Sequence, residues 1–258
     1  MIVAGIDIGS ITAETVILQD KQILTSSILP TGANSRAAAE RSLAVALEQA
    51  ELKKEDLSYI VTTGYGRASF PFAHKMITEI TCHARGAFFV RPDTRTVIDI
   101  GGQDSKVIRL DVRGRNMDFQ MNDKCAAGTG RFLEVMAHAL EVKLEDLGKL
   151  SRTTDRTIKI SSMCTVFAES EVISLIAESQ PKEVIIRGLH EAIADRILGL
   201  VHRVGVEEVV TLTGGVAKNE GVVRALEERL GVKLFVPPEP QIIGALGAAL
   251  LAKDFSPR

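Results

Sequence analysis

The chain has 258 residues, of which 45% are hydrophobic and 25% are charged, a balance typical of a folded protein with one large core or two closely joined lobes. The net charge of -2 gives no broad basic surface, which argues against nucleic acid or an anionic membrane as the main partner. The first residues lack a basic leader segment, and the apolar run from Ile242 is far shorter than the roughly 20 residues that span a bilayer, so we expect a cytoplasmic protein.

The first half of the chain contains one pattern twice. Residues 3–20, "VAGIDIGSITAETVILQD", predict a strand, a turn at residues 7–10 and a second strand, and a third strand follows over residues 22–29. From Thr96, "TVIDIGGQDSKVIRLDVRGRNMDFQM" repeats the plan, with its first turn at residues 99–102. The repeat predicts two lobes that arose by duplication, with a ligand bound between them.

Helices are expected after each of these strand groups. The first covers residues 35–52, with Ser35 as its N-cap, and a strand follows over residues 58–64. Further helices are expected over residues 181–204 and 216–230, and "PPEPQIIGALGAALLA" from Pro237 predicts a closely packed Ala- and Gly-rich helix. We place the first lobe at residues 1–92 and the second at 93–258, with the last helix able to return to the first lobe.

The two Asp-x-Gly turns have the composition of phosphate-binding loops. A strand that ends in aspartate and continues through small residues brings backbone N–H groups against phosphate oxygens, while the carboxylate holds a hydrated magnesium ion. One such turn is weak evidence, because a glycine hairpin is more often only a turn, but two with matching strands are stronger evidence. A third element, Gly214 and Gly215 between a strand and a helix, could receive a nucleotide at the helix N-terminus.

The three cysteines form an odd set without a secretion signal, which argues against a disulfide framework. Cys125 and Cys164 each precede a helix-forming run, and a helix N-terminus favours a thiolate or an anionic metal–sulfur cluster. A cysteine-bound iron–sulfur cluster generally needs four cysteines, so a cluster with these two would be shared by two identical chains. This reasoning predicts a homodimer.

Other interpretations of the cysteines remain. Free cysteine is among the most buried residue types, and Cys82 is interpreted as structural. Zinc at Cys82 and His83 is disfavoured because adjacent residues cannot easily supply two ligands. A redox disulfide between Cys125 and Cys164 is open, although such bonds are uncommon in the cytoplasm.

Together, the glycine elements resemble those of the actin, sugar kinase and heat-shock chaperone ATPase superfamily. That resemblance implies an α/β fold with two ribonuclease H-like lobes and a cleft for ATP or ADP with Mg²⁺. It implies Asp7 and Asp99 as magnesium-side carboxylates, and either Gln103 or Asp104 as the group that orients the attacking water. The other residues that we expect at the nucleotide are Gly9, Ser10, Thr12, Gly101, Gly102, Gly214, Gly215, Lys218, Asn219 and Gln241.

A narrower resemblance comes from the stretches "GYGR", "VIDIGGQDSKVI", "FQMNDKCAAGTGRFLEVMA", "CTVFAESEVIS" and "TGGVAKN". They resemble the activator component of 2-hydroxyacyl-CoA dehydratases, a family that includes the ATPase subunits of benzoyl-CoA reductase. The resemblance implies that Cys125 and Cys164 of two subunits hold one [4Fe-4S] cluster per homodimer. It also implies an electron taken from ferredoxin or flavodoxin and delivered, with ATP, to a partner iron–sulfur dehydratase or reductase. Glu169 could join the magnesium site by the same analogy, although a helix-surface glutamate is the commoner case.

The sequence therefore predicts an ATP-dependent, low-potential electron donor that activates a 2-hydroxyacyl-CoA dehydratase. Within the same class, the partner could instead be a benzoyl-CoA reductase or a double-cubane-cluster protein. A small-metabolite kinase would also explain the nucleotide loops, but it leaves the two cysteine segments unexplained. A filament-forming, actin-like protein is a third option, which predicts nucleotide-dependent sedimentation instead of an oxygen-sensitive dimer. The partner's substrate, the electron donor and the number of ATP molecules used per electron stay open.

Overall fold

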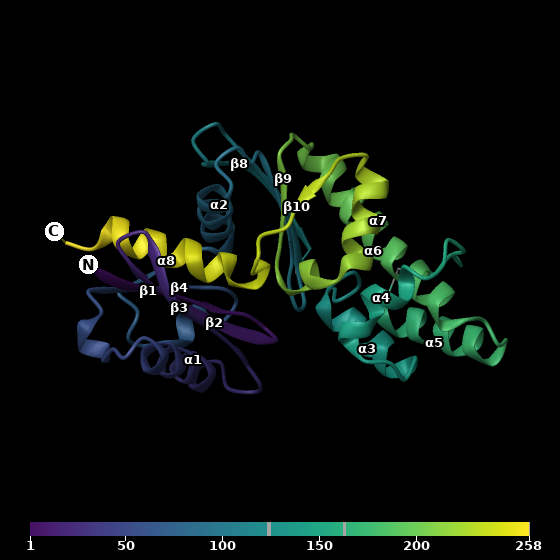
Figure 1. Cartoon of the computed structure of the whole chain (residues 1–258), viewed down its shortest axis with the longest axis horizontal. Helices are drawn as coiled ribbons and strands as arrows, with labels where there is room; N and C mark the ends of the chain where they lie inside the picture. Colours follow the sequence, from purple (N-terminus) through teal and green to yellow (C-terminus); the bar gives the residue numbers. More distant parts are fainter. Residues whose placement is uncertain (123–124, 162–163, 258) are drawn as a thin grey trace.

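The computed structural model describes residues 1–122, 125–161 and 164–257, and it contains two five-stranded sheets with helices packed around them (Figure 1). The two sheets lie side by side along the long axis of the molecule, and both chain ends lie beside the first sheet. No helix in the described parts of the chain has the length and apolar character needed to cross a membrane.

The first sheet has the strand order β3-β2-β1-β4-β5. Strands β1 to β3 are antiparallel neighbours, whereas β4 is parallel to β1 and β5 is parallel to β4. Its strands are β1 (Ile2–Ile8), β2 (Thr12–Gln19), β3 (Gln22–Pro30), β4 (Tyr59–Thr63) and β5 (Lys75–Met76).

Helix α1 (Ser35–Gln49) covers the first three strands of this sheet. The expected N-cap, Ser35, is wrong, because Ser35 is already the first helical residue. The cap is Asn34, whose side-chain oxygen accepts a hydrogen bond of 3.0 Å from the amide of Ala37. Asparagine is among the strongest N-cap residues, which explains why the helix is capped one residue earlier than expected.

The second sheet repeats the first strand for strand. Its order is β10-β9-β6-β7-β8, with antiparallel pairing from β6 to β8 and parallel pairing of β9 with β6 and β10. The two sheets therefore have one topology, which confirms the predicted α/β fold with a repeated architecture. These strands are β6 (Thr96–Ile100), β7 (Ser105–Leu110), β8 (Asn116–Asn122), β9 (Val210–Thr213) and β10 (Leu234–Phe235).

Five helices accompany the second sheet within the described residues. The longest, α6, begins one residue after the expected start at Pro181, and it contacts α4, α7, β7 and β8. Helix α7 begins at Glu220, later than expected, because residues 215–218 form a 3-10 turn and Asn219 caps the helix. The helices are α3 (Gly130–Ala139), α4 (Leu147–Ser151), α5 (Thr165–Ala177), α6 (Lys182–Val204) and α7 (Glu220–Leu230).

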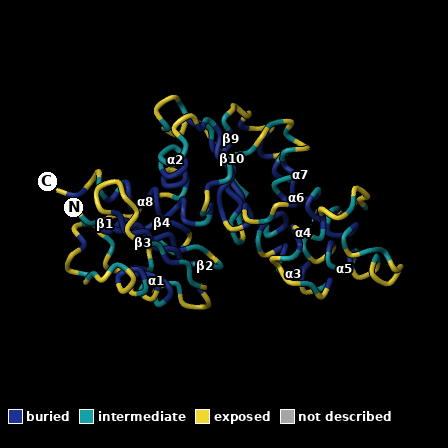
Figure 2. Tube along the Cα trace, in the orientation of Figure 1, coloured by how far each residue is buried: buried dark blue, intermediate teal, exposed yellow. Residues whose placement is uncertain are grey.

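Helices α2 (Glu79–Val90) and α8 (Ile243–Phe255) pack against each other between the sheets (Figure 1). Helix α8 also covers β1, β2 and β4, while α2 contacts β6, β7 and β8. One buried apolar cluster includes α2, α8, Val3 of the first sheet and Ile108 of the second, and the buried trace runs through this region in Figure 2. The C-terminal helix thus lies on the first sheet, and the lobe boundary at residues 92 and 93 stays a prediction.

Candidate functional site

A cleft of about 560 Å³ lies between the two sheets and is lined by residues from both halves of the chain. The fold brings together every residue that the sequence placed at the nucleotide, although the individual contacts stay a prediction. From the first half they are Asp7, Gly9, Ser10, Thr12, Asp99, Gly101, Gly102, Gln103 and Asp104, and from the second half Gly214, Gly215, Lys218, Asn219 and Gln241.

The first glycine turn, residues 9–12, connects β1 to β2 and lines the cleft. The amide of Gly9 donates to the carbonyl of Thr12 at 2.9 Å, and the hydroxyl of Thr31 donates to the carbonyl of Gly9 at 2.9 Å. Gly64, at the end of β4, has φ +84°, and a Cβ there would lie 2.3 Å from Oδ1 of Asp7. The "GYGR" turn therefore needs glycine at position 64, because a side chain would collide with the carboxylate that lines the cleft.

The second glycine turn, residues 101–104, connects β6 to β7. The amide of Gly101 donates to the carbonyl of Asp104 at 3.0 Å, which closes the turn. A Cβ on Gly102 would lie 2.7 Å from Cγ1 of Ile11, so the two glycine turns approach each other closely, and residues of both line the cleft. Paired turns with exposed N–H groups can hold an anion between them.

A buried ammonium group lies beside this turn. Nζ of Lys106 is 3.0 Å from Oε2 of Glu79, 3.0 Å from Oδ2 of Asp99 and 2.9 Å from Oδ2 of Asp104. Burial alone would lower the pKa of Lys106, but the three carboxylates outweigh that effect and raise it well above its usual range. Lys106 therefore stays charged and fixes three carboxylates from α2, β6 and the turn.

The two predicted magnesium-side carboxylates differ in their surroundings. Burial by itself raises the pKa of Asp99, yet His83, Lys106 and a hydrogen bond from Thr213 outweigh it and lower the pKa to about 2. In the described parts of the chain no lysine or arginine pairs with Asp7, and burial together with Glu14 raises its pKa well above the usual range. Burial also raises the pKa of Glu14 to about 7. Such a surplus of carboxylates over cations suits a divalent cation that keeps most of its waters, so the residues fit a hydrated Mg²⁺ bound through one or two carboxylates.

His83 lies between the two aspartates. Its Nδ1 lies 3.3 Å from Oδ1 of Asp99, and its Nε2 lies 3.8 Å from Oδ2 of Asp7. Sequence reasoning missed both His83 and Lys106, because it considered His83 only as a zinc ligand and interpreted Lys106 as part of a strand. The available signal was the pairing of β6 with β7, which puts Lys106 directly opposite Asp99.

The other end of the cleft is formed by the Gly-Gly loop and helices of the second half. The side-chain oxygen of Asn219 accepts hydrogen bonds from the amides of Gly221 and Val222, at 3.0 and 3.2 Å, and so caps α7. Nζ of Lys218 pairs with Glu239 at 2.8 Å. No sequence pattern indicated the lining residues from α3, α4 and the segment between them, because their position depends on helix packing. These residues are Gly130, Leu133, Glu134, Leu144, Glu145, Gly148 and Lys149.

The cysteines lie outside the cleft. Cys164 is the N-cap of α5, as expected, and is partly exposed. Cys125 is also partly exposed, but its expected place at a helix start is wrong, because a turn through Gly128 separates it from α3, whose N-cap is Thr129. Helices α3 and α5 lie together on the side of the second sheet away from the first (Figure 1).

Two further expectations concern metal ligands. Glu169 lies on α5 and is not among the residues that line the cleft, so the structure does not bring it to the magnesium-side carboxylates. Cys82 is buried, and burial raises the pKa of its thiol to about 12, as suits a structural residue. All three cysteines are free thiols, and within the described residues no three His, Cys, Asp or Glu side chains are placed to hold a metal ion.

Comparison with known proteins identifies the family of the chain. The model of the BadF/BadG/BcrA/BcrD ATPase family matches residues 4–252. The chain belongs to this family. The activator of lactoyl-CoA dehydratase from Anaerotignum propionicum is 52% identical to it over 255 residues, which cover 98% of each chain. The (R)-2-hydroxyglutaryl-CoA dehydratase activating ATPase from Acidaminococcus fermentans is 51% identical and covers 96% of this chain and 95% of its own.

Solved structures of family members have the same fold. Component A of the Acidaminococcus fermentans (R)-2-hydroxyglutaryl-CoA dehydratase superposes with a TM-score of 0.95 at 50% identity, covering 98% of each chain. The activator of the 2-hydroxyisocaproyl-CoA dehydratase from Clostridium difficile, solved with bound ADPNP, has a TM-score of 0.95 at 47% identity and covers 98% of this chain and 95% of its own. A glucokinase from Streptomyces griseus, at 13% identity and a TM-score of 0.61, shares the fold alone. The resemblance and the actin-like ATPase fold expected from the sequence are thus confirmed.

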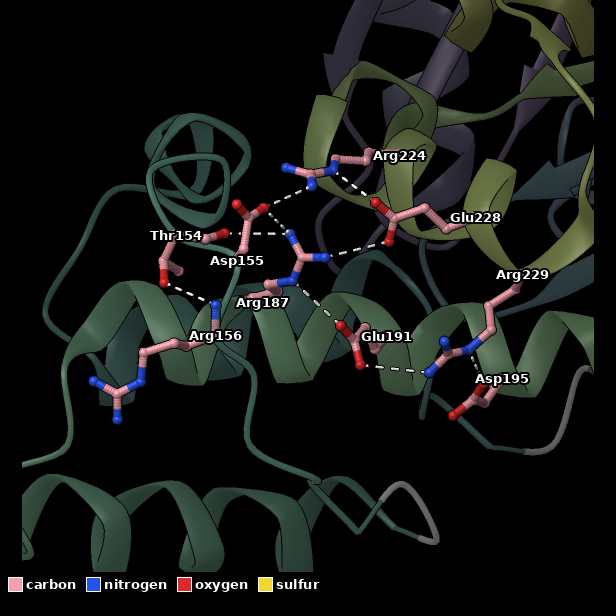
Figure 3. A network of polar contacts seen from close by, with 9 residues as sticks. All are labelled: Thr154, Asp155, Arg156, Arg187, Glu191, Asp195, Arg224, Glu228 and Arg229. Carbon is pink, nitrogen blue, oxygen red and sulfur yellow. Dashed lines mark hydrogen bonds and ion pairs between the residues drawn. The ribbon is translucent and has the colours of Figure 1, made fainter.

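A polar network holds Thr154 and Asp155, which belong to the segment between α4 and α5 (Figure 3). The guanidinium of Arg187, on α6, donates to the carbonyl of Thr154 at 3.2 Å and pairs with Asp155 and with Glu228 of α7. Arg224 of α7 also binds Asp155, at 3.0 Å. The segment is therefore attached to both helices, and α7 begins at the Asn219 end of the cleft.

Proposed function

We propose that the protein is an ATP-dependent activator that delivers low-potential electrons to a 2-hydroxyacyl-CoA dehydratase. The observation that carries the proposal is the pair of partly exposed thiols, Cys125 and Cys164, in segments joined to a two-turn phosphate cleft. Phosphotransfer by a kinase does not require such a pair of thiols. Relatives that share about half of the sequence are named as activators of lactoyl-CoA, 2-hydroxyisocaproyl-CoA and (R)-2-hydroxyglutaryl-CoA dehydratases.

In the proposed site, the two glycine turns bind the phosphates of ATP from opposite sides. The nucleoside binds at the end of the cleft that contains Gly214 and Asn219. Asp7 would hold the magnesium ion through its waters, because no described lysine or arginine pairs with its carboxylate, while Asp99 is already held by Lys106 and Thr213. Bound magnesium would neutralise charge on the phosphates. His83 lies between these two carboxylates, 3.3 Å from Asp99 and 3.8 Å from Asp7.

Cys125 and Cys164 would hold one [4Fe-4S] cluster between two copies of the chain. The fit rests on two features: both cysteines are partly exposed, and Cys164 is the N-cap of a helix of 13 residues whose N-terminal amides favour the negative charge of a thiolate-bound cluster. The cluster supplies one-electron transfer. We expect ferredoxin or flavodoxin as the donor and an iron–sulfur dehydratase as the acceptor.

ATP would act through the angle between the two lobes, residues 1–92 and 93–258. The cleft joins both sheets, so a ligand that binds one arrangement better shifts the population toward it. The cysteine segments belong to the second half, and they would move with it. A benzoyl-CoA reductase as the partner is the second candidate, because one of the polypeptides of the benzoyl-CoA reductase from Thauera aromatica is 35% identical over 260 residues.

The test uses protein purified without oxygen. It measures the iron and acid-labile sulfide content per chain and the molecular mass in solution. A shared cluster requires about two irons and two sulfides per chain in a dimer. Cys164→Ser should lose the iron and keep ADPNP binding. Protein without iron after anaerobic reconstitution, or a full cluster on each monomer, would overturn the shared cluster. Phosphotransfer to a sugar that survives Cys164→Ser would favour a kinase.

A further inference from the structure

The second glycine turn is bonded directly to the start of α3. The amide of Gly130 donates to the carbonyl of Gly101 at 2.9 Å, and the amide of Arg131 donates to the carbonyl of Gly102 at 2.8 Å. Gly130 also allows this approach, since a Cβ there would already lie 3.3 Å from the Gly101 carbonyl oxygen. A displacement of the turn must therefore move the N-terminus of α3.

Thr129 extends this connection toward Cys125. Its hydroxyl lies 2.9 Å from the carbonyl oxygen of Gly102 and 2.6 Å from the carbonyl oxygen of Ala126, the residue after Cys125. Cys125 is held on its other side, where the side-chain amide of Asn122 donates to its carbonyl at 2.9 Å. One buried hydroxyl thus contacts both the phosphate side of the cleft and the cysteine loop.

A hydroxyl has one proton, so Thr129 can donate a full hydrogen bond to only one of these two carbonyls at a time. Each carbonyl keeps another donor: the Arg131 amide for Gly102, and the Thr129 amide, at 3.1 Å, for Ala126. A switch of the hydroxyl therefore leaves neither carbonyl without a partner, so it avoids the cost of an unpaired buried group. Thr129 is 0% exposed, so water does not compete for the proton.

A threonine at an N-cap position ordinarily uses its hydroxyl to bind a backbone amide of the first helical turn. Thr129 occupies the N-cap position of α3, but its side chain makes no such bond. Helix capping therefore does not account for the direction of this hydroxyl, which faces the two carbonyls.

We propose that Thr129 is a positioning residue that transmits the state of the second glycine turn to Cys125. When a nucleotide moves that turn, the hydroxyl changes its preferred acceptor between Gly102 and Ala126, and the cysteine loop is released or held accordingly. The inference rests on the proposed function, because it assumes that ATP binds in the cleft.

The experiment uses the full-length chain without iron, in a Cys164→Ser background, and measures the alkylation rate of Cys125 by iodoacetamide with and without ADPNP and Mg²⁺. Cys82 should contribute little, because it is buried and its pKa is raised to about 12. We expect ADPNP to change the alkylation rate by about 3- to 10-fold, the factor that corresponds to the net free energy of one hydrogen bond. Thr129→Ser should keep this response, and the isosteric Thr129→Val should lose it without losing ADPNP binding.

Thr94→Val is the matched control. Thr94 is also 0% exposed, its hydroxyl lies 2.7 Å from that of Thr211, and it is not among the residues that line the cleft. This variant should be less stable than the parent and keep the nucleotide response. If Thr94→Val lost the response as Thr129→Val does, the effect would come from general destabilisation and the inference would be overturned.

Three other results would also show whether Thr129 transmits the state of the second glycine turn to Cys125. A Thr129→Val protein that responds as Thr129→Ser does would overturn the inference, and so would a parent that binds ADPNP with no change at Cys125. A parent that does not bind ADPNP would overturn the proposed function as well. If Thr129→Val does not fold, amide exchange in the parent decides: ADPNP should change protection over residues 126–131, and no change there would overturn the inference.

Discussion

Two neighbouring side chains of the second glycine turn have different freedom to act on a water molecule. One carboxylate oxygen of Asp104 lies 2.9 Å from Nζ of Lys106, so this side chain is held in an ion pair. Gln103 is exposed and lines the cleft, and it makes no side-chain hydrogen bond to any described residue. An amide that can both donate and accept is suited to orient an attacking water, as a glutamine does in unrelated GTPases.

We therefore expect Gln103→Ala to lower kcat for ATP hydrolysis by about 100-fold or more, with little change in KM. Asp104→Asn should cost far less, because asparagine can still accept a hydrogen bond from Lys106. Steady-state ATPase kinetics measure both, and Gln22→Ala, at an exposed glutamine on β3, is the control. A larger loss of kcat in Asp104→Asn than in Gln103→Ala would assign the water to Asp104.

At this scale, the sequence could predict the residues whose role follows from local pattern. A strand that ends in Asp-x-Gly implies a turn soon after it. Both turns are present, but they begin two residues later than predicted, at Gly9 and Gly101, because Asp7 and Asp99 still pair within β1 and β6. Lys106 lies directly opposite Asp99 in the β6–β7 pair, so the expected hairpin could have indicated it. His83 could not be found in this way, because a histidine in a helix becomes part of the site only when α2 meets the second sheet.

At the scale of elements, a buried histidine connects two helices. His190 of α6 is 1% exposed, and its Nε2 lies 3.2 Å from the side-chain nitrogen of Asn219, the cap of α7. That amide nitrogen donates, so Nε2 must accept, which requires neutral imidazole. Burial lowers the pKa of His190 from 6.5 to about 3. The contact between α6 and the cap of α7 therefore depends on an uncharged side chain.

The lowered pKa of His190 makes the stability of the protein depend on pH. Between about pH 3 and 6.5 the unfolded chain protonates His190 and the folded chain does not, so the free energy of unfolding should fall as the pH falls through this window. The slope from one group is at most about 1.4 kcal/mol per pH unit. Urea denaturation at pH 7 and pH 5 should show a smaller loss for His190→Gln than for the parent. Equal losses would mean that His190 is accessible to protons in the folded state.

The helix starts show where element prediction fails. Cys164 was placed correctly because α5 follows it directly. Cys125 was misplaced because residues 126–129 form a turn with Gly128 at φ +82°, and small residues such as Ala126 and Gly130 suit either a turn or a helix start. The start of α3 is fixed by hydrogen bonds that the amides of Gly130 and Arg131 donate to the carbonyls of Gly101 and Gly102, which are distant in sequence. Local pattern contains no information about such partners.

At the scale of the whole molecule, the contact between α2 and α8 determines how the two sheets are held. The helices approach so closely that a Cβ on Gly247 would lie 1.8 Å from the carbonyl oxygen of Cys82, and one on Gly86 would lie 2.2 Å from that of Ile243. Both clashes are with backbone, which cannot rotate away as a side chain can. The repeated pattern predicted the two sheets, but this distance between helices is set by tertiary packing.

Gly247→Ala should therefore destabilise the protein by about 1–3 kcal/mol, because the added methyl group must push α8 away from α2. Gly199→Ala is the matched control: it lies inside α6, is exposed and would have nothing within 4 Å of its Cβ, so alanine should stabilise that helix by about 0.5–1 kcal/mol. Urea denaturation measures both changes.

Because α8 follows Gln241 at the cleft and covers the first sheet, Gly247→Ala should also weaken ADPNP binding, whereas Gly199→Ala should not. Equal stability of the two variants would show that α2 and α8 can separate at little cost, and the close contact would then not hold the two sheets together.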